Sequence, residues 1–306
     1  MKRFIINILA IALLLLIGII VVDIYLISFP HKGSYYTMER NTALAYQRLE
    51  ALKDTNKMVI IGGSNGTFGI NSEMLHEAFK MPIVNTATQA SIGVRMQFEI
   101  YKELLRPGDI VIFIPEYHKE LANLYGNAIL LRVLTTHVPQ AFKHVSLRQW
   151  LFLHKYIGIY YNEMKRSKYS VEFEGPYSYK SLNKYGDIAC EREHQNSIET
   201  TYKCGEIDKA LINYYQYVHT FAKQNDIQLV FLPPTLINRE FVRFRKDIQA
   251  HAECLKRNGI PLQADPSRYT FPDSLYYDTS YHMTLEGAKL RTQKMIEDLH
   301  RVLKKS

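Results

Sequence analysis

The segment MVIIGGSNG, residues 58–66, indicates both the fold class and a candidate site. Its first four residues form a short, wholly apolar run, typical of a strand that is buried on both faces of a parallel sheet. Two glycines and Ser64 follow directly, ahead of residues that can begin a helix. Such a turn places Ser64 at the carboxyl edge of the sheet, where open α/β sheets bind their ligands.

Apolar runs and helical patterns alternate outward from this segment. We predict further strands at 82–84, 110–114 and 227–232, and helices at 72–79, 96–105, 206–224, from Pro234 to about 257, and 284–303. Strands that alternate with helices at this spacing indicate βαβ units and a mostly parallel sheet. Right-handed crossovers place helices on both faces, so the expected fold is a three-layer α/β/α domain over residues 58–306.

Residues 119–205 do not keep this rhythm. They contain the one tryptophan, Trp150, many tyrosines, and a polar stretch at 172–203. A long irregular stretch inside a compact domain is more often a functional loop than an accident. We therefore expect an insertion that packs over the edge of the sheet and shapes the substrate site.

The first 29 residues predict a membrane anchor. Lys2 and Arg3 precede 19 residues, 4–22, of which only Asn7 is polar. About 20 apolar residues cross a bilayer core, and the positive end stays in the cytoplasm. We expect a single pass through the inner (cytoplasmic) membrane, then a spacer and leading helix at 30–57, with the main domain outside. A cleaved signal peptide is the alternative, but no small-x-small site follows the apolar run.

Charge and cysteine content restrict the partners. The net charge of +8 is spread along the chain without a block of like charges, which argues against nucleic acid as a partner. Cys190 and Cys204 could form a disulfide that leaves Cys254 over, or all three could be separate thiols. Without a Cys-x-x-Cys pair, we expect no metal site.

A second polar cluster, YDTSYHMT, spans residues 277–284 just before the last predicted helix. Asp278 can accept a hydrogen bond from Nδ1 of His282 and hold the ring in one tautomer, which leaves Nε2 to take a proton from Ser64. Each residue alone has an ordinary explanation. Ser64 could be a helix N-cap, His282 a helix-start histidine, and Asp278 a turn residue.

The pairing of IIGGSNG with Asp278-x-x-x-His282 resembles the SGNH/GDSL hydrolase superfamily. More narrowly, it resembles the membrane-anchored branch that contains the teichoic-acid D-alanine transfer protein and the alginate-type O-acetylation proteins. The similar segments are SNGTFGIN at 64–71, VNTATQASIG at 84–93, PGDIVIFIPEY at 107–117 and NKYGD at 183–187. The resemblance covers most of residues 58–118 and 205–300 and is weak across the insertion.

This resemblance implies a serine nucleophile at Ser64, with His282 as base and Asp278 as its orienting acid. It also implies an oxyanion-binding amide at Gly93 and a site position at Asn85, and no cofactor. The implied reaction moves an acyl group, such as acetyl, to or from a cell-envelope glycan. An integral-membrane O-acyltransferase could be the partner that delivers the acyl group.

The chain departs from the family pattern in three ways. Gly-Gly-Ser replaces Gly-Asp-Ser, Glu116–Tyr117 stand where the third block has Gly-x-Asn-Asp, and four residues rather than three separate the acid and the histidine. A usual oxyanion donor is therefore missing. Glu116 could line the site or cap a helix, and Arg95 could hold an anionic substrate or form a surface ion pair.

Two other functions remain open beside acyl transfer. A plain carbohydrate or lipid esterase would use the same residues with water as acceptor. A non-catalytic envelope scaffold would keep the fold only as a binding surface.

Overall fold

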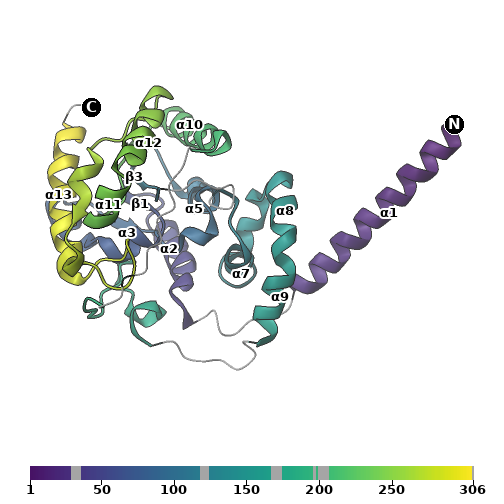
Figure 1. Cartoon of the computed structure of the whole chain (residues 1–306), viewed down its shortest axis with the longest axis horizontal. Helices are drawn as coiled ribbons and strands as arrows, with labels where there is room; N and C mark the ends of the chain where they lie inside the picture. The colour runs from purple at the N-terminus through teal and green to yellow at the C-terminus, as the bar shows by residue number, and fades with distance from the viewer. Residues whose placement is uncertain (29–35, 118–123, 167–173, 196–197, 199–206, 305–306) are drawn as a thin grey trace.

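The computed structural model describes residues 1–28, 36–117, 124–166, 174–195, 198 and 207–304. Helix α1, Lys2–Ile27, projects from the remainder of the molecule, which is folded around a central sheet (Figure 1). The helix has a mean hydropathy of 3.3 over its most apolar window and none of that window is buried. By length and composition it can cross a membrane.

The central sheet has four parallel strands in the order β2-β1-β3-β4. Their bounds are β1 Met58–Gly62, β2 Ile83–Asn85, β3 Ile110–Ile114 and β4 Gln228–Phe231. Val59 pairs with Val84 on one side and with Val111 on the other. The prediction of a mostly parallel α/β sheet is therefore confirmed, and each of the four predicted strands forms within one residue of its expected limits at either end.

Sequence analysis missed a second, two-stranded parallel sheet. Strand β5, Leu236–Ile237, pairs with β6, Thr270–Phe271. Two-residue strands are too short to show a hydrophobic period, so the sequence pattern does not predict them. They pair across more than 30 residues of chain.

Alternate residues of the central strands enter two different apolar clusters. Val59 and Ile61 belong to the larger cluster, whereas Met58 and Ile60 belong to the other. Side chains of α2, α5, α7, α9, α10 and α12 join the larger cluster, and those of α4 and α13 join the second. Their bounds are α2 Asn41–Ala51, α4 Ser72–Phe79, α5 Val94–Glu99, α7 Ala128–Thr136, α9 Ile157–Arg166, α10 Lys209–Gln224, α12 Arg245–Arg257 and α13 Leu285–Leu303.

Two predicted helices are broken in the structure. The helix expected at 96–105 is α5 followed by a 3-10 turn at Lys102–Leu104, because Tyr101 N bonds to Phe98 O and its fully buried ring packs into the core. The helix expected up to about 257 is split at Phe244 into α11, Asn238–Arg243, and α12.

The described parts of residues 119–205 form two bodies. Residues 124–166 contain α7, α9 and the short helix α8, Leu147–Leu153, and they meet the end of α1 (Figure 1). Residues 174–195 lie instead against helix α3, Ser64–Gly69, where Ile188 N donates to Thr67 O (3.0 Å).

Candidate active site

Ser64 is the first residue of helix α3, Ser64–Gly69, and follows β1 after one residue, Gly63. The glycines before it let the turn pack closely against the end of β3. A Cβ atom at Gly62 would lie 2.6 Å from Ile114 O, and one at Gly63 would lie 2.5 Å from Glu116 Oε1. Larger residues would push the turn away from the sheet.

The loop that carries Asp278 and His282 is closed by its own backbone. Tyr277 N donates to His282 O (2.8 Å), and the hydroxyl of Thr279 accepts a bond from the N–H of His282 (3.2 Å). Thr284 then caps α13 through a bond from Gly287 N (3.2 Å). The four-residue spacing is therefore accommodated in a closed loop that places His282 against Ser64 and Asp278 against His282.

Three side chains form a continuous hydrogen-bonded chain. Ser64 Oγ lies 2.8 Å from His282 Nε2, and His282 Nδ1 lies 2.8 Å from Asp278 Oδ1. The ring of Phe68 stacks on the imidazole, with centroids 4.1 Å apart and planes 10° apart. When Nδ1–H donates to the carboxylate, Nε2 can accept the serine proton, which is the geometry required for an activated hydroxyl nucleophile.

Tyr177, from the insertion, adds a fourth group to this chain. Its hydroxyl donates to Asp278 Oδ2 (2.5 Å) and lies 3.2 Å from His282 Nδ1. Burial alone would raise the pKa of the Asp278 carboxyl. The hydrogen bond and charge of His282, with the Tyr177 hydroxyl, outweigh burial and hold that pKa below its ordinary value. Asp278 is therefore kept ionised opposite the imidazole.

Replacing Tyr177 with phenylalanine is expected to slow the reaction of Ser64 with a fluorophosphonate by roughly 10- to 100-fold, the worth of a hydrogen bond to a charged group. Asp278 would lose its second donor and hold His282 less firmly. The control is Tyr179→Phe, measured in the same way. Tyr179 is close in sequence to Tyr177, but its ring contacts Tyr36 and Arg40 rather than the acid. Equal rates in the two variants would show that Tyr177 does not position the acid.

A buried network fixes the turn that carries Ser64. Glu116 Oε1 accepts bonds from both the backbone N–H and the side-chain amide of Asn65 (3.2 Å each). Arg291 of α13 donates to Asn65 O (2.6 Å) and to Asn65 Oδ1 (3.1 Å). Burial lowers the pKa of the Arg291 guanidinium to about 10, so it remains charged at neutral pH. Of the two roles expected for Glu116, the structure shows the capping of α3.

Asn85 lies at the end of β2 and holds the same turn from the other side. Its side-chain amide donates to Gly66 O (3.1 Å) and to Asp187 Oδ1 (2.8 Å), and its oxygen accepts from Ala87 N (3.0 Å). Both amide hydrogens are therefore committed to protein acceptors. In this conformation Asn85 organises the turn and the NKYGD segment around Asp187.

Gly93 and Arg95 lie apart from these contacts. The N–H of Gly93 donates to Ala90 O (2.9 Å), so in this structure it closes a turn and is not free for an oxyanion. Its φ of +80° and its close packing on residues 124–126 explain the glycine. Arg95 lies 3.7 Å from Glu99 and lines a hollow of about 240 Å³ with Arg148 and Tyr214, among others, but not with Ser64 or His282.

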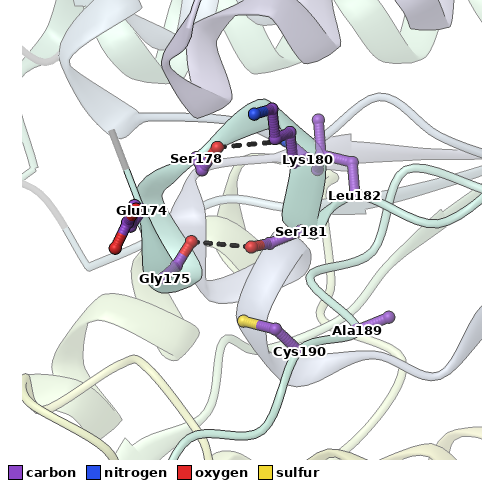
Figure 2. A pocket seen from close by; sticks show the side chains of 8 residues that line it. All are labelled: Glu174, Gly175, Ser178, Lys180, Ser181, Leu182, Ala189 and Cys190. Carbon is purple, nitrogen blue, oxygen red and sulfur yellow. Dashed lines mark hydrogen bonds between the residues drawn. The ribbon is translucent and has the colours of Figure 1, made fainter. Parts of the chain in front are cut away.

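A larger hollow of about 470 Å³ lies beside the 3-10 turn Gly175–Tyr177. Figure 2 shows the residues that line it. It is lined by Glu174, Gly175, Ser178, Lys180, Ser181, Leu182, Ala189 and Cys190. Its serine hydroxyls bond within the segment: Ser181 Oγ donates to Gly175 O (2.6 Å), and Ser178 Oγ accepts from Lys180 N (3.2 Å).

Sequence analysis missed three residues of this region, namely Tyr177, Arg192 and Arg291. Arg192 donates to Phe68 O and Met283 O (2.7 Å each), which joins α3 to the end of the histidine loop. A signal existed for Arg291, because it shares the buried face of α13 with Ala288 and Met295 at helical spacing. An arginine on a core-facing stripe indicates a buried polar network.

The other site predictions concern metals and cysteines. Within the described ranges, no group of three His, Cys, Asp or Glu residues is arranged to hold a metal ion. Cys190 and Cys254 are free cysteines. Cys204 lies outside the described residues, and so does the Cys190–Cys204 disulfide that was one of the two alternatives.

We compared the chain with protein-family models, with curated proteins and with solved structures, and none of them matches it.

Proposed function

We propose that this protein is a serine-dependent acyltransferase or esterase of the SGNH type, with a three-layer α/β/α domain. One observation carries the proposal: the Ser64–His282–Asp278 chain, with both of its links at 2.8 Å. The parallel sheet, the serine directly after β1 and the acid–histidine loop directly before α13 support the fold assignment. If Ser64 served only to cap a helix, nothing would require the imidazole of His282 to lie against its hydroxyl.

In this mechanism Ser64 Oγ attacks the acyl carbonyl while His282 Nε2 takes the serine proton. The imidazolium is stabilised by Asp278, and it returns the proton to the leaving oxygen as the carbon–oxygen bond breaks. The acyl group then rests on Ser64 as an ester. His282 next takes the proton of an acceptor hydroxyl, or of water, while that oxygen attacks the ester carbonyl. As the bond between the acyl carbon and Ser64 Oγ breaks, the imidazolium returns the proton to Oγ.

Among the described residues, the proposed site for the oxyanion has one available N–H donor, that of Ser64, because the second proposed donor already has an acceptor. The N–H of Ser64, at the start of α3, has no acceptor within the helix and can face the developing charge. The N–H of Gly93 would have to leave Ala90 O to join it. Because one lost oxyanion donor costs about 10²–10³ in rate, we expect slow turnover of small esters.

The proposed location follows from α1. Lys2 and Arg3 at its start favour a cytoplasmic N-terminus, which would put residues after Ile27 outside the inner (cytoplasmic) membrane. A cell-envelope glycan is then the proposed acceptor. An integral-membrane O-acyltransferase is the proposed partner, and acetyl is the proposed acyl group.

A scaffold function is the second candidate, and the occupied N–H of Gly93 is the observation that favours it. A scaffold would bind the glycan without cleaving esters.

Acceptor dependence tests the proposed reaction. The full chain in detergent is given a chromogenic acetyl ester, with and without a hydroxyl-rich oligosaccharide. We expect faster ester cleavage and an acetylated oligosaccharide in the parent and neither in Ser64→Ala. Cleavage that the sugar does not accelerate would identify a hydrolase. No cleavage by a folded parent would favour the scaffold.

A further inference from the structure

Helices α8 and α9 present an apolar face that the described chain leaves uncovered. Leu147 and Leu151 of α8 are 75% and 61% exposed, and Ile159 of α9 is 51% exposed. Leu147 and Leu151 are four residues apart and share one side of α8, while Gln149 and Leu153 are buried on the other. The exposed leucines therefore form one outward stripe and are not packing residues of the core.

Cations and aromatic rings border this stripe. Arg148 and Lys155 are exposed beside it, and Lys155 Nζ lies 3.8 Å from the centroid of the Phe152 ring. Trp150 is half-buried on the same helix. Exposed apolar side chains flanked by basic residues and by a tryptophan are typical of helices that lie in a membrane interface.

Contacts with α1 hold this face at the end of the apolar helix. His154, between α8 and α9, places Nδ1 2.9 Å from Oδ2 of the buried Asp23. The hydroxyl of Tyr160 donates to Ile27 O (3.1 Å). Figure 1 shows α8 and α9 beside the C-terminal end of α1.

The length of α1 sets the depth of these contacts. Its 26 residues measure about 39 Å at 1.5 Å per residue, which exceeds a hydrocarbon core of about 30 Å. The last turns, with Asp23 and Ile27, therefore emerge into the headgroup region. Helices that contact those turns lie at the same level.

We propose that the exposed face of α8 and α9 lies on the bilayer that α1 crosses. Leu147, Leu151 and Ile159 enter the boundary between headgroups and acyl chains, and Arg148 and Lys155 bind anionic headgroups. The inference rests on the proposed anchoring by α1 and is independent of the proposed chemistry. Lipid, rather than a second protein, is the occupant because the contacts with α1 bring this face to the membrane surface.

The one tryptophan of the chain, Trp150, makes the contact measurable without a label. The full chain is reconstituted into phosphatidylcholine–phosphatidylglycerol vesicles whose lipids carry bromine at shallow or deep acyl positions. With excitation selective for tryptophan, we expect bromine to quench Trp150, and shallow bromine to quench it most. The double variant Leu147→Glu/Leu151→Glu is expected to lose most of this quenching.

The matched control is Val242→Glu/Leu290→Glu, which charges two exposed apolar residues of α11 and α13, on the far side of the molecule from α1 (Figure 1). It should be quenched like the parent. Flotation of the vesicles separates the two proposals. Protein that floats although bromine does not quench Trp150 would overturn the lipid contact and leave the anchor intact. This is the result expected if another protein covers the face. Protein that does not float would overturn the anchor itself.

Discussion

His282→Ala is expected to slow the reaction of Ser64 with a fluorophosphonate by about 10⁴-fold or more, because the serine proton then has no acceptor. The imidazole is the one group whose nitrogen lies 2.8 Å from Ser64 Oγ among the contacts that the structure describes. Asp278→Asn should cost about as much, since an amide that donates to Nδ1 would stabilise the wrong tautomer. Reaction rates are followed by the mass of the intact chain.

The control for this experiment is His219→Ala, because His219 is exposed on α10, away from the site. Its rate should equal that of the parent. If His282→Ala reacted as fast as His219→Ala, the short contact with Ser64 would be a structural hydrogen bond and the proposed base would be wrong.

Arg291→Met is expected to lower the free energy of unfolding by about 3 kcal/mol. The variant leaves two oxygens of Asn65 without their donor, and each buried polar atom without a partner costs about 1–3 kcal/mol. It also removes the positive charge that faces the buried Glu116. Unfolding by denaturant is followed through the fluorescence of Trp150.

Two variants make the Arg291 result specific. Arg301→Met removes an exposed arginine of the same helix that contacts Asp298, and it should cost less than about 1 kcal/mol. Arg291→Lys keeps the charge but not the forked donor, so its stability should lie between those of the parent and Arg291→Met. Equal stability of Arg291→Met and Arg301→Met would contradict the network described for α3.

The local sequence pattern was sufficient to predict the strands of the central sheet. The run from Met58 to Ile61 is apolar at every position, as a strand covered on both faces must be, and it forms β1. Residues 110–114 carry the same signal and form β3. Thr284 stands before an amphipathic stretch and caps α13. In each case the signal lies within a few consecutive residues.

The parts that sequence analysis missed depend on distant partners. Tyr177 is one tyrosine among 22, and only its contact with Asp278, 101 residues away, distinguishes it. Asn85 was expected at an oxyanion- or substrate-binding position, but its side-chain amide donates to Asp187 and Gly66. Gly93 differs, because the bond from its N–H to Ala90 O is local, but the close packing of Gly93 on residues 124–126 involves a distant segment.

The central claim, that Ser64 is an activated nucleophile, is tested most directly by mapping a fluorophosphonate adduct on the full chain in detergent. The parent and Ser267→Ala, in which an exposed serine is lost, should both carry the adduct on the peptide that contains Ser64. Ser64→Ala should carry none. A folded parent that forms no adduct, or an adduct that persists in Ser64→Ala, would contradict the account.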